Sequence, residues 1–201
     1  MYWSDDNDKA PEFVIPDDVV DLAFRIDCPT LPLDHAHALS SALLDRLPWL
    51  ADEAHAGVHL IHGAASGNGW FRPEDTENEL LHLSRRTRMR LRVPRHRLEE
   101  TQRLSGERLD IDGHPLVLGK TEVFLLSSLS TLFARYVITA EDVDESEFLE
   151  QAAARLRALD INCRKMLGGI MHALSFPDGP VVTRSLMVAE LEPEQSVHLQ
   201  Q

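Results

Sequence analysis

Four large apolar residues occupy every second position between residues 20 and 26, which predicts a half-buried β-strand. Pro32 limits this strand, and the spacing then becomes helical. The expected helix has one apolar stripe, formed by Ala36, Leu39, Leu43 and Leu47. Asp34 is its expected N-cap and Pro48 its end. A β-strand followed by an amphipathic helix is therefore the first predicted unit of structure.

The pattern then continues through a second half of the same unit. The segment GVHLIHGAASGNG predicts a strand that runs into a glycine-rich loop, and TRMRLRVP alternates so that Met89, Leu91 and Val93 share one face. Pro94 begins a second predicted helix, and LDIDGHPLVLG predicts a strand or hairpin. The order over residues 20–119 is strand, helix, strand, strand, helix, strand, which is the ferredoxin-like plan.

The same plan begins again after residue 120. The expected elements are a strand at 129–139, an acidic helix at 144–159, a strand pair in INCRKMLGGIMHAL and PVVTRSLMVAEL, and a helix start in PEQSVHLQQ. We therefore predict an α+β fold of tandem ferredoxin-like (RRM/RAMP-type) units. The expected divisions are an acidic flexible lead-in at 1–18, an N-terminal unit at 19–120 and a C-terminal unit at 121–201. The second unit is expected to be truncated at Gln201, without its last strand.

Composition places the chain among globular proteins, since 43% of its residues are hydrophobic and 26% are charged. The net charge of -13 argues against binding of nucleic acid over the whole surface but permits a local basic site. Cys28 and Cys163 fit no metal or redox pattern, which favours a reducing compartment. The acidic N-terminus does not have the apolar core of a signal peptide, and no apolar run has the length of a membrane span. We expect a cytoplasmic protein without membrane contact.

A concentration of arginine interrupts this acidic composition. Residues 85–108 carry a net charge of +6, which leaves -19 for the rest of the chain. The candidate RNA-binding residues are Arg85, Arg86, Arg88, Arg90, Arg92, Arg95 and Arg97. On a strand, alternate arginines repeat about every 6.5–7 Å, close to the spacing of successive phosphates, and guanidinium groups suit phosphate oxygens. The alternative is an edge strand protected from aggregation by its charge.

Two histidines open the first predicted helix, in the sequence DHAHAL. His35 and His37 are candidates for proton transfer in a metal-free ribonuclease reaction, because imidazole can serve as base or acid near neutral pH. The free N–H groups of a helix N-terminus could hold a phosphate nearby. By the helical wheel, we expect His35 to reach a cleft between the two units and His37 to point more toward solvent. The alternative is a pair of ordinary surface histidines beside a core stripe.

Other sites are not indicated. His55 and His59 are four residues apart, but they straddle Gly57 at an expected loop-to-strand junction instead of lying on a helix face. Neither they nor His62 have an acidic partner at a ligand spacing, so no metal site is predicted. The loop GAASGNGW matches no phosphate-binding motif, and no nucleophile motif occurs. We therefore expect no cofactor.

Several long stretches resemble one family. They are DLAFRIDCPTLPLDHAHALSSAL, GVHLIHG, LLHLSRRTRMRLRVP, LSGERLDIDGHPLVLG and RKMLGGIMHALSFPDGPVVTRSLMVAELEPEQSVHLQQ. Together they resemble the CRISPR-associated repeat-RNA processing endoribonucleases, the sixth-numbered Cas proteins, in their Myxan-subtype branch.

The resemblance implies two ferredoxin-like units and metal-independent cleavage of CRISPR precursor RNA in its repeat hairpin. It implies a 2′,3′-cyclic phosphate product, and a catalytic histidine at or near the first helix, at His35 with His37 as second choice. It also implies that the protein stays on the guide RNA hairpin as a subunit of a Cascade-type complex. Two alternatives stand beside it: a non-cleaving RNA-binding subunit of the same fold, and a protein-interaction adaptor, which the arginine strand disfavours.

Overall fold

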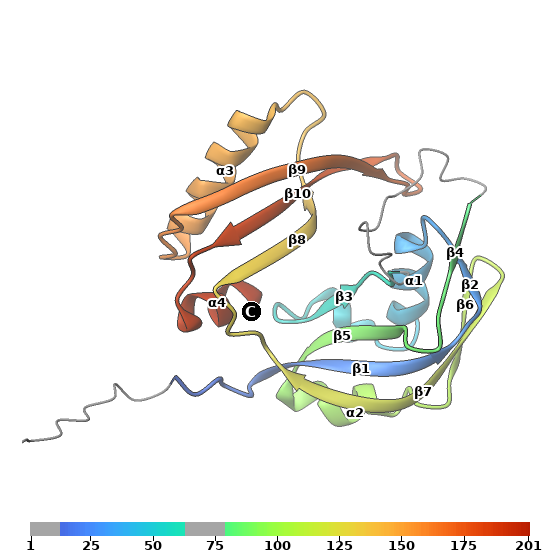
Figure 1. The fold of residues 1–201 in the computed structure, drawn as a ribbon. Helices are drawn as coiled ribbons and strands as arrows, with labels where there is room; N and C mark the ends of the chain where they lie inside the picture. Colours follow the sequence, from blue (N-terminus) through green and yellow to red (C-terminus); the bar gives the residue numbers. More distant parts are fainter. Residues whose placement is uncertain (1–12, 63–78) are drawn as a thin grey trace, which may run out of the picture.

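The computed structural model describes residues 13–62 and 79–201. Most of the predicted acidic lead-in and the glycine-rich loop lie outside the described residues. The described chain forms two units, each built on an antiparallel sheet, and Figure 1 shows these sheets one above the other. The order of strands and helices agrees with the tandem ferredoxin-like fold predicted from the sequence.

The first unit has the ferredoxin-like order of strands and helices, with an extra strand pair and short 3₁₀ turns. Its main elements are β1 (Val19–Asp27), α1 (Ala36–Leu44), β3 (Gly57–His59), β5 (Arg88–Pro94), α2 (Leu98–Gln102), β6 (Arg108–Ile111) and β7 (His114–Leu125). The sheet has the order β3-β5-β1-β7-β6. A separate pair of strands, β2 (Thr30–Pro32) and β4 (Leu80–His82), was not predicted. Short 3₁₀ turns cover Pro48–Ala51 and Arg95–Arg97.

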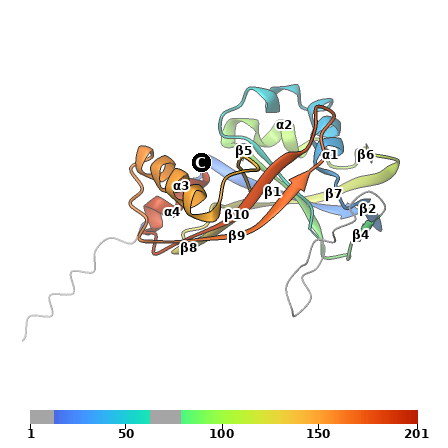
Figure 2. The same ribbon diagram turned by 90° about the horizontal axis from the view of Figure 1, so that it is seen from above.

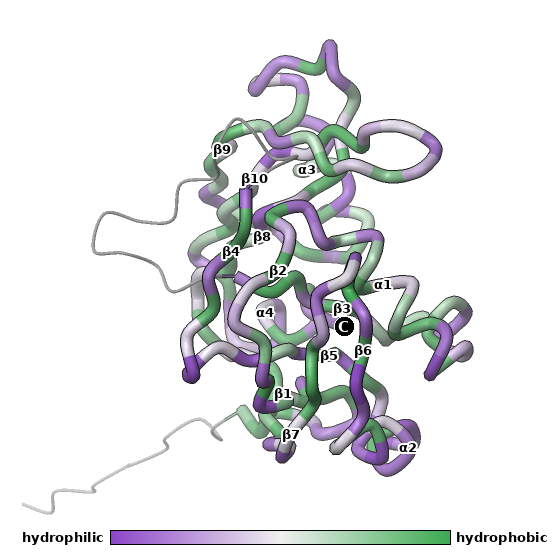
Figure 3. Tube along the Cα trace, turned by 90° about the vertical axis from the view of Figure 1, so that its right-hand side faces the viewer, coloured by the Kyte–Doolittle hydropathy of each residue, from purple (hydrophilic) through white to green (hydrophobic). Residues whose placement is uncertain are grey.

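The alternation in β1 and β5 explains where the first core lies. Leu22 pairs with Leu91, and Phe24 pairs with Met89, so the apolar residues of both strands share one face. Those four side chains are fully buried, together with Leu39 and Leu43 of α1. Figure 3 shows hydrophobic and hydrophilic positions close together along the trace around β1, β5 and β7, and in β5 buried positions alternate with more exposed ones from Met89 to Val93. One face of the sheet is therefore committed to the core, and the arginines of β5 lie on the other.

The second unit contains β8 (Thr131–Ile138), α3 (Glu145–Ala158), β9 (Lys165–Leu174), β10 (Val181–Ala189) and α4 (Pro193–Gln200). Its sheet order, β8-β10-β9, matches that of β1, β5 and β3 in the first unit. Asp144 caps α3 by accepting a hydrogen bond from the Glu147 N–H at 2.9 Å. Phe148, Ala152 and Leu156 of α3 pack with β10 to form a second core. Figure 2 shows α3 beside this sheet, well away from α1 and α2.

Helix α4 joins the two units. The Gln200 side-chain amide donates to the Ser127 carbonyl and accepts from the Ser127 N–H, and Ser196 donates to the Leu129 carbonyl. Residues 127–129 belong to the connection between β7 and β8, so α4 holds that connection in place. Figure 1 shows α4 between the two sheets, on the side where β7 leads into β8.

Four local predictions need correction. Leu125 pairs with Val20, so the first unit extends beyond the predicted boundary at residue 120. Phe13 and Ile15 pack on a small core with Val197, so the end of the lead-in is not free chain. The second helix is shorter than expected, because a 3₁₀ turn precedes α2.

The fourth correction concerns the start of α1. The N-cap is His35, whose carbonyl accepts the first helical bond from the Leu39 N–H at 2.9 Å. The Asp34 carboxylate instead accepts a hydrogen bond from the Ser175 N–H of the second unit at 2.7 Å.

In the part of the chain that the structure describes, no helix has the length and apolarity needed to cross a membrane.

Candidate functional site

His35 is enclosed by the first unit. Only 3% of the residue is exposed, and its Nε2 accepts a hydrogen bond from the Ile61 N–H at 3.2 Å. Nδ1 therefore carries the proton and donates it to the Pro32 carbonyl at 3.0 Å. This neutral ring links β2, the start of α1 and the end of β3. The expectation that His35 reaches a cleft between the units is wrong, because the chain before and after α1 closes around it.

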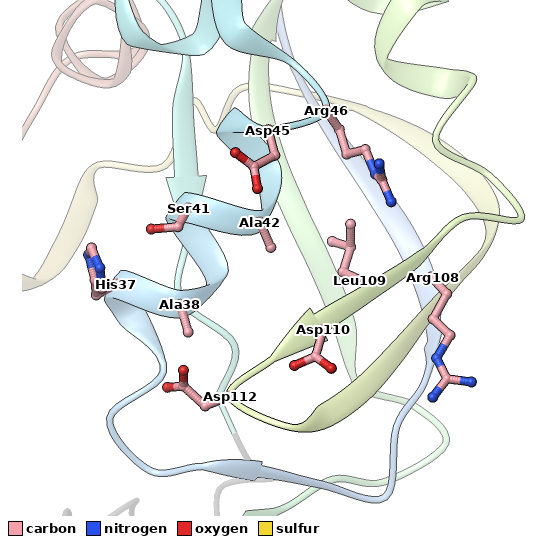
Figure 4. A pocket seen from close by; sticks show the side chains of 10 residues that line it. All are labelled: His37, Ala38, Ser41, Ala42, Asp45, Arg46, Arg108, Leu109, Asp110 and Asp112. Atoms are coloured by element: carbon pink, nitrogen blue, oxygen red, sulfur yellow. The ribbon is translucent and has the colours of Figure 1, made fainter.

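His37 is exposed, as predicted, and lies at one end of a cavity of about 460 Å³. The cavity is formed by one side of α1 and by the hairpin of β6 and β7. Figure 4 shows His37 and Asp112 on one side, with Arg46 and Arg108 on the other. An exposed imidazole at the edge of such a cavity can exchange a proton with a bound molecule.

The cavity carries charges of both signs. Ser41 of α1 and Asp45, the C-cap of that helix, lie between the two ends, and Asp110 faces them from β6. The Asp110 carboxylate already accepts a hydrogen bond from the Gly113 N–H at 2.7 Å, which closes the hairpin turn. Gly113 has a φ of 81°, a conformation that favours glycine. The motif DIDGH therefore fixes the hairpin tip opposite α1. Sequence reasoning did not find this cavity, because its two walls lie far apart along the chain.

A larger groove of about 1100 Å³ runs between the two units. Arg86, Arg88, Arg90 and Arg92 line it from the first unit, and Arg135 lines it from β8. Aromatic rings accompany the cations: the Arg90 guanidinium lies 5.0 Å from the ring centre of Phe124, and that of Arg135 lies 5.6 Å from Phe133. The groove thus combines positive charge with flat apolar surfaces.

Arg92 is committed to a structural contact. Its Nε and Nη2 donate to the two carboxylate oxygens of Asp21 at 2.9 and 3.2 Å, and Nη1 donates to the Gln200 carbonyl of α4. Burial by itself would raise the pKa of Asp21, but hydrogen bonds from His59 and Arg92 outweigh it and lower that pKa to about 2. Arg92 therefore joins the first sheet to the second unit, and only part of its guanidinium is available to a ligand.

The remaining predicted arginines divide between two places. Arg85 and Arg86 are exposed in the turn before β5, where Arg88 donates to the Arg85 carbonyl at 3.1 Å. Arg95 and Arg97 do not line the groove; Arg97 stacks over Trp49 and donates to Glu100 at 3.2 Å. The alternation that places arginines on one face ends at Pro94, so the seven candidates do not form one surface.

Tyr136 connects the two units at the groove. Its ring lies 6.2 Å from His62, which follows β3, and 5.9 Å from His172 of β9, measured between ring centres. Four residues further along, Phe176 packs edge-on against His37 with ring centres 5.8 Å apart. In the described ranges 13–62 and 79–201, no three His, Cys, Asp or Glu side chains are grouped as metal ligands. No local pattern in the sequence connects Tyr136 or Phe176 with the histidines of α1.

Paired ferredoxin-like units, separated by a groove that carries arginines and aromatic rings, define a class of nucleic-acid-binding protein. Comparison with known families narrows that class. The model of the Cas6 CRISPR family matches residues 20–201. The CRISPR-associated endonuclease Cas6 of Myxococcus xanthus (strain DK1622) is 32% identical over 182 residues, which cover 90% of this chain and 74% of that protein. The chain belongs to the Cas6 family.

Proposed function

We propose that this protein is an endoribonuclease that cleaves CRISPR precursor RNA in the repeat hairpin, with His37 as a proton-transfer group. The observation that carries this proposal is the position of His37, exposed at the edge of a cavity that also contains Arg46 and Arg108. His35, the first choice from the sequence, serves instead to hold α1 in place. The name of the Myxococcus xanthus relative supports the endonuclease activity.

The proposed reaction needs only the RNA and side chains. The ribose 2′-oxygen loses its proton and attacks the adjacent phosphorus, and the bond to the 5′-oxygen breaks as that oxygen gains a proton. The products are a 2′,3′-cyclic phosphate and a free 5′-hydroxyl. His37 either accepts the first proton or donates the second. Arg46 and Arg108, on the other side of the cavity, would hold a neighbouring phosphate of the RNA.

The groove between the units is the proposed path for the RNA. Arg86, Arg88 and Arg90 would bind phosphates, while Phe133 and Tyr136 offer surfaces on which unpaired bases can stack. The chain from His172 to Phe176, whose rings contact Tyr136 and His37, spans at most about 13 Å between Cα atoms. RNA held in the groove would therefore extend by several nucleotides to reach His37.

We further propose that the product stays bound and that the protein thereby joins a Cascade-type complex. Phosphate contacts in the groove are made equally by substrate and product, since cleavage changes only the scissile linkage. A second function, RNA binding without cleavage, is favoured by one observation: Asp45, Asp110 and Asp112 line the same cavity as His37. Carboxylates so close would oppose entry of a phosphate.

Single-turnover cleavage distinguishes these functions. We expect excess protein with 5′-labelled repeat RNA in EDTA to cut at one phosphate and to leave a cyclic phosphate end. His37→Ala should slow this cleavage about 100- to 10,000-fold, the usual range for loss of an acid or base, while hairpin affinity changes only a few-fold. His82→Ala, at an exposed histidine of β4, is the matched control. Protection of the hairpin without cleavage by the wild-type protein would establish the non-cleaving alternative.

A further inference from the structure

The hairpin between β9 and β10 has a tip shaped by its sequence. Residues 175–180 read SFPDGP, and the Gly179 N–H donates to the Phe176 carbonyl at 3.0 Å, which closes a four-residue turn. Pro177 fits the second position of such a turn, because its φ is already fixed. Gly179 has a φ of 120°, which other residues rarely adopt. The tip is therefore built to hold Ser175 and Phe176 in a defined place.

This tip contacts the start of α1 at two points. The Ser175 N–H donates to the Asp34 carboxylate at 2.7 Å, and the Phe176 ring lies edge-on to the His37 ring at 5.8 Å between centres. Asp34 immediately precedes the N-cap His35, and His37 lies in the first turn of α1, so both contacts are made at the start of this helix. Ser175 and Phe176 of the second unit thus contact Asp34 and His37 of the first.

We infer that Phe176 and Asp34 are positioning residues for His37, so that the second unit sets the orientation of the imidazole that transfers the proton. This inference rests on the proposed function. An exposed histidine in the first turn of a helix can occupy several rotamers, and only some point its ring into the cavity. The Phe176 ring restricts that choice, and the bond from Ser175 to Asp34 keeps the tip in register with α1.

The geometry also explains why the contact comes from the second unit. The cavity walls, α1 and the β6–β7 hairpin, both belong to the first unit, and His37 lies at their outer edge. The hairpin tip approaches that edge from outside, so it can contact the imidazole without filling the cavity. Phe176 does not line the cavity and need not touch RNA to affect the reaction.

The test compares Phe176→Ala with Phe176→Tyr, which keeps the ring. Single-turnover rate at saturating protein, hairpin Kd, melting temperature and the NMR shifts of the His37 ring protons are measured for each. We expect Phe176→Ala to lose about 10- to 100-fold in rate, as expected for a catalytic group displaced by about 1 Å, with Kd within about threefold. The His37 ring protons should shift, because an adjacent aromatic ring is removed. Phe176→Tyr should cut within about threefold of wild type.

The control is Leu167→Ala, at an exposed apolar residue of β9 that lies outside the cavity and the groove. It should change neither the rate nor the His37 resonances. Asp34→Ala should lose rate as Phe176→Ala does, and Asp34→Asn should retain most of it because the amide oxygen can still accept from Ser175. If Phe176→Ala does not fold, the comparison of Asp34→Ala with Asp34→Asn tests the positioning role instead.

The outcomes separate the inference from the proposed function. Folded Phe176→Ala with wild-type rate, or with unchanged His37 resonances, overturns the positioning role even if His37→Ala is inactive. If His37→Ala cuts at the wild-type rate, the proposed role of His37 fails, and the positioning inference fails with it. A Phe176→Tyr protein that is as slow as Phe176→Ala would show that the aromatic ring of Phe176 does not position His37.

Discussion

His35 and His37 are two positions apart, yet His35 is buried and His37 is exposed. His35 has both ring nitrogens bonded to backbone groups, Pro32 on one side and Ile61 on the other. A histidine held in this way cannot accept or release a proton without breaking one of these bonds. His37 faces a cavity and has an aromatic neighbour from the other unit. The proposed chemistry at the start of α1 therefore uses both residues: His35 holds the backbone and His37 transfers the proton.

This division gives different expectations for stability. His35→Ala should lower the free energy of unfolding by about 2–4 kcal/mol, because it leaves a cavity and two unpaired backbone groups. His37→Ala should change it by less than about 0.5 kcal/mol, as for most surface positions. Urea denaturation followed by circular dichroism measures both. If His35→Ala were as stable as the wild type, the His35 ring could not be buried with both of its nitrogens hydrogen-bonded to the backbone.

At the scale of the element, β5 shows how one strand can serve the core and the groove. Met89, Leu91 and Val93 are fully buried, while the arginines between them line the groove. Along the groove face the arginines differ in their contacts. Arg90 reaches over Phe124, whereas Arg92 is bound by Asp21 and by the end of α4. The arginines of β5 that we propose as phosphate ligands, Arg88 and Arg90, therefore lie in its N-terminal half.

We expect the double change Arg88→Ala/Arg90→Ala to weaken hairpin binding by about 3 kcal/mol, near the lower limit for two charge-assisted hydrogen bonds. The slope of log K against log salt should fall by about 0.9 for each phosphate that the variant no longer binds, if the hairpin stem is contacted. Arg95→Ala/Arg97→Ala removes the same charge outside the groove and should have a smaller effect. Equal losses of affinity in both double variants, in a filter-binding titration, would indicate net charge instead of the groove.

At the scale of the whole molecule, Arg92 connects an ion pair of the first unit to the second unit. Asp21 of β1 binds Arg92 of β5, and Arg92 also donates to the last turn of α4. His59 of β3 lies 3.4 Å from the same carboxylate. Breaking the pair would leave a charge without a partner in a largely buried place, which is costly. The orientation of the second unit therefore depends on an ionised carboxylate in the first.

The pKa of Asp21, lowered from 3.8 to about 2, gives this dependence a direction. Because the folded state holds the ionised form, the stabilisation is complete above about pH 4 and is lost as the pH falls toward 2. Asp21→Asn should therefore destabilise the protein by roughly 2 kcal/mol at neutral pH, and the difference from wild type should shrink toward pH 2. Urea denaturation between pH 2 and 7 measures it.

The control for this change is Asp17→Asn, whose exposed carboxylate lies 3.9 Å from Arg95. It should alter stability little at any pH, because an exposed pair contributes little. A constant difference between Asp21→Asn and wild type down to pH 2 would contradict the lowered pKa.

Much of the fold could be predicted from local pattern. The alternation at 20–26 predicted β1, the acidic amphipathic stretch predicted α3 between Glu145 and Ala158, and the late strand pair predicted β9 and β10. These elements follow from periodicity, which depends only on neighbouring residues. The boundary between the units was less accurate, because β7 continues to Leu125 only through its pairing with β1. The strands β2 and β4 were missed because each is short and is defined only by its pairing with the other, which lies far along the chain.

By itself the sequence determined the order of the elements, the apolar face of β5 and the presence of arginines and histidines where RNA chemistry could use them. The tertiary structure decided which of them are available. Arg92 is bound because Asp21 lies opposite it in the next strand, and His35 is enclosed because the residues before and after α1 fold over it. Phe176 reaches His37 across the two units. Periodicity fixes the direction of a side chain relative to its own element, but the groups it meets come from distant parts of the chain.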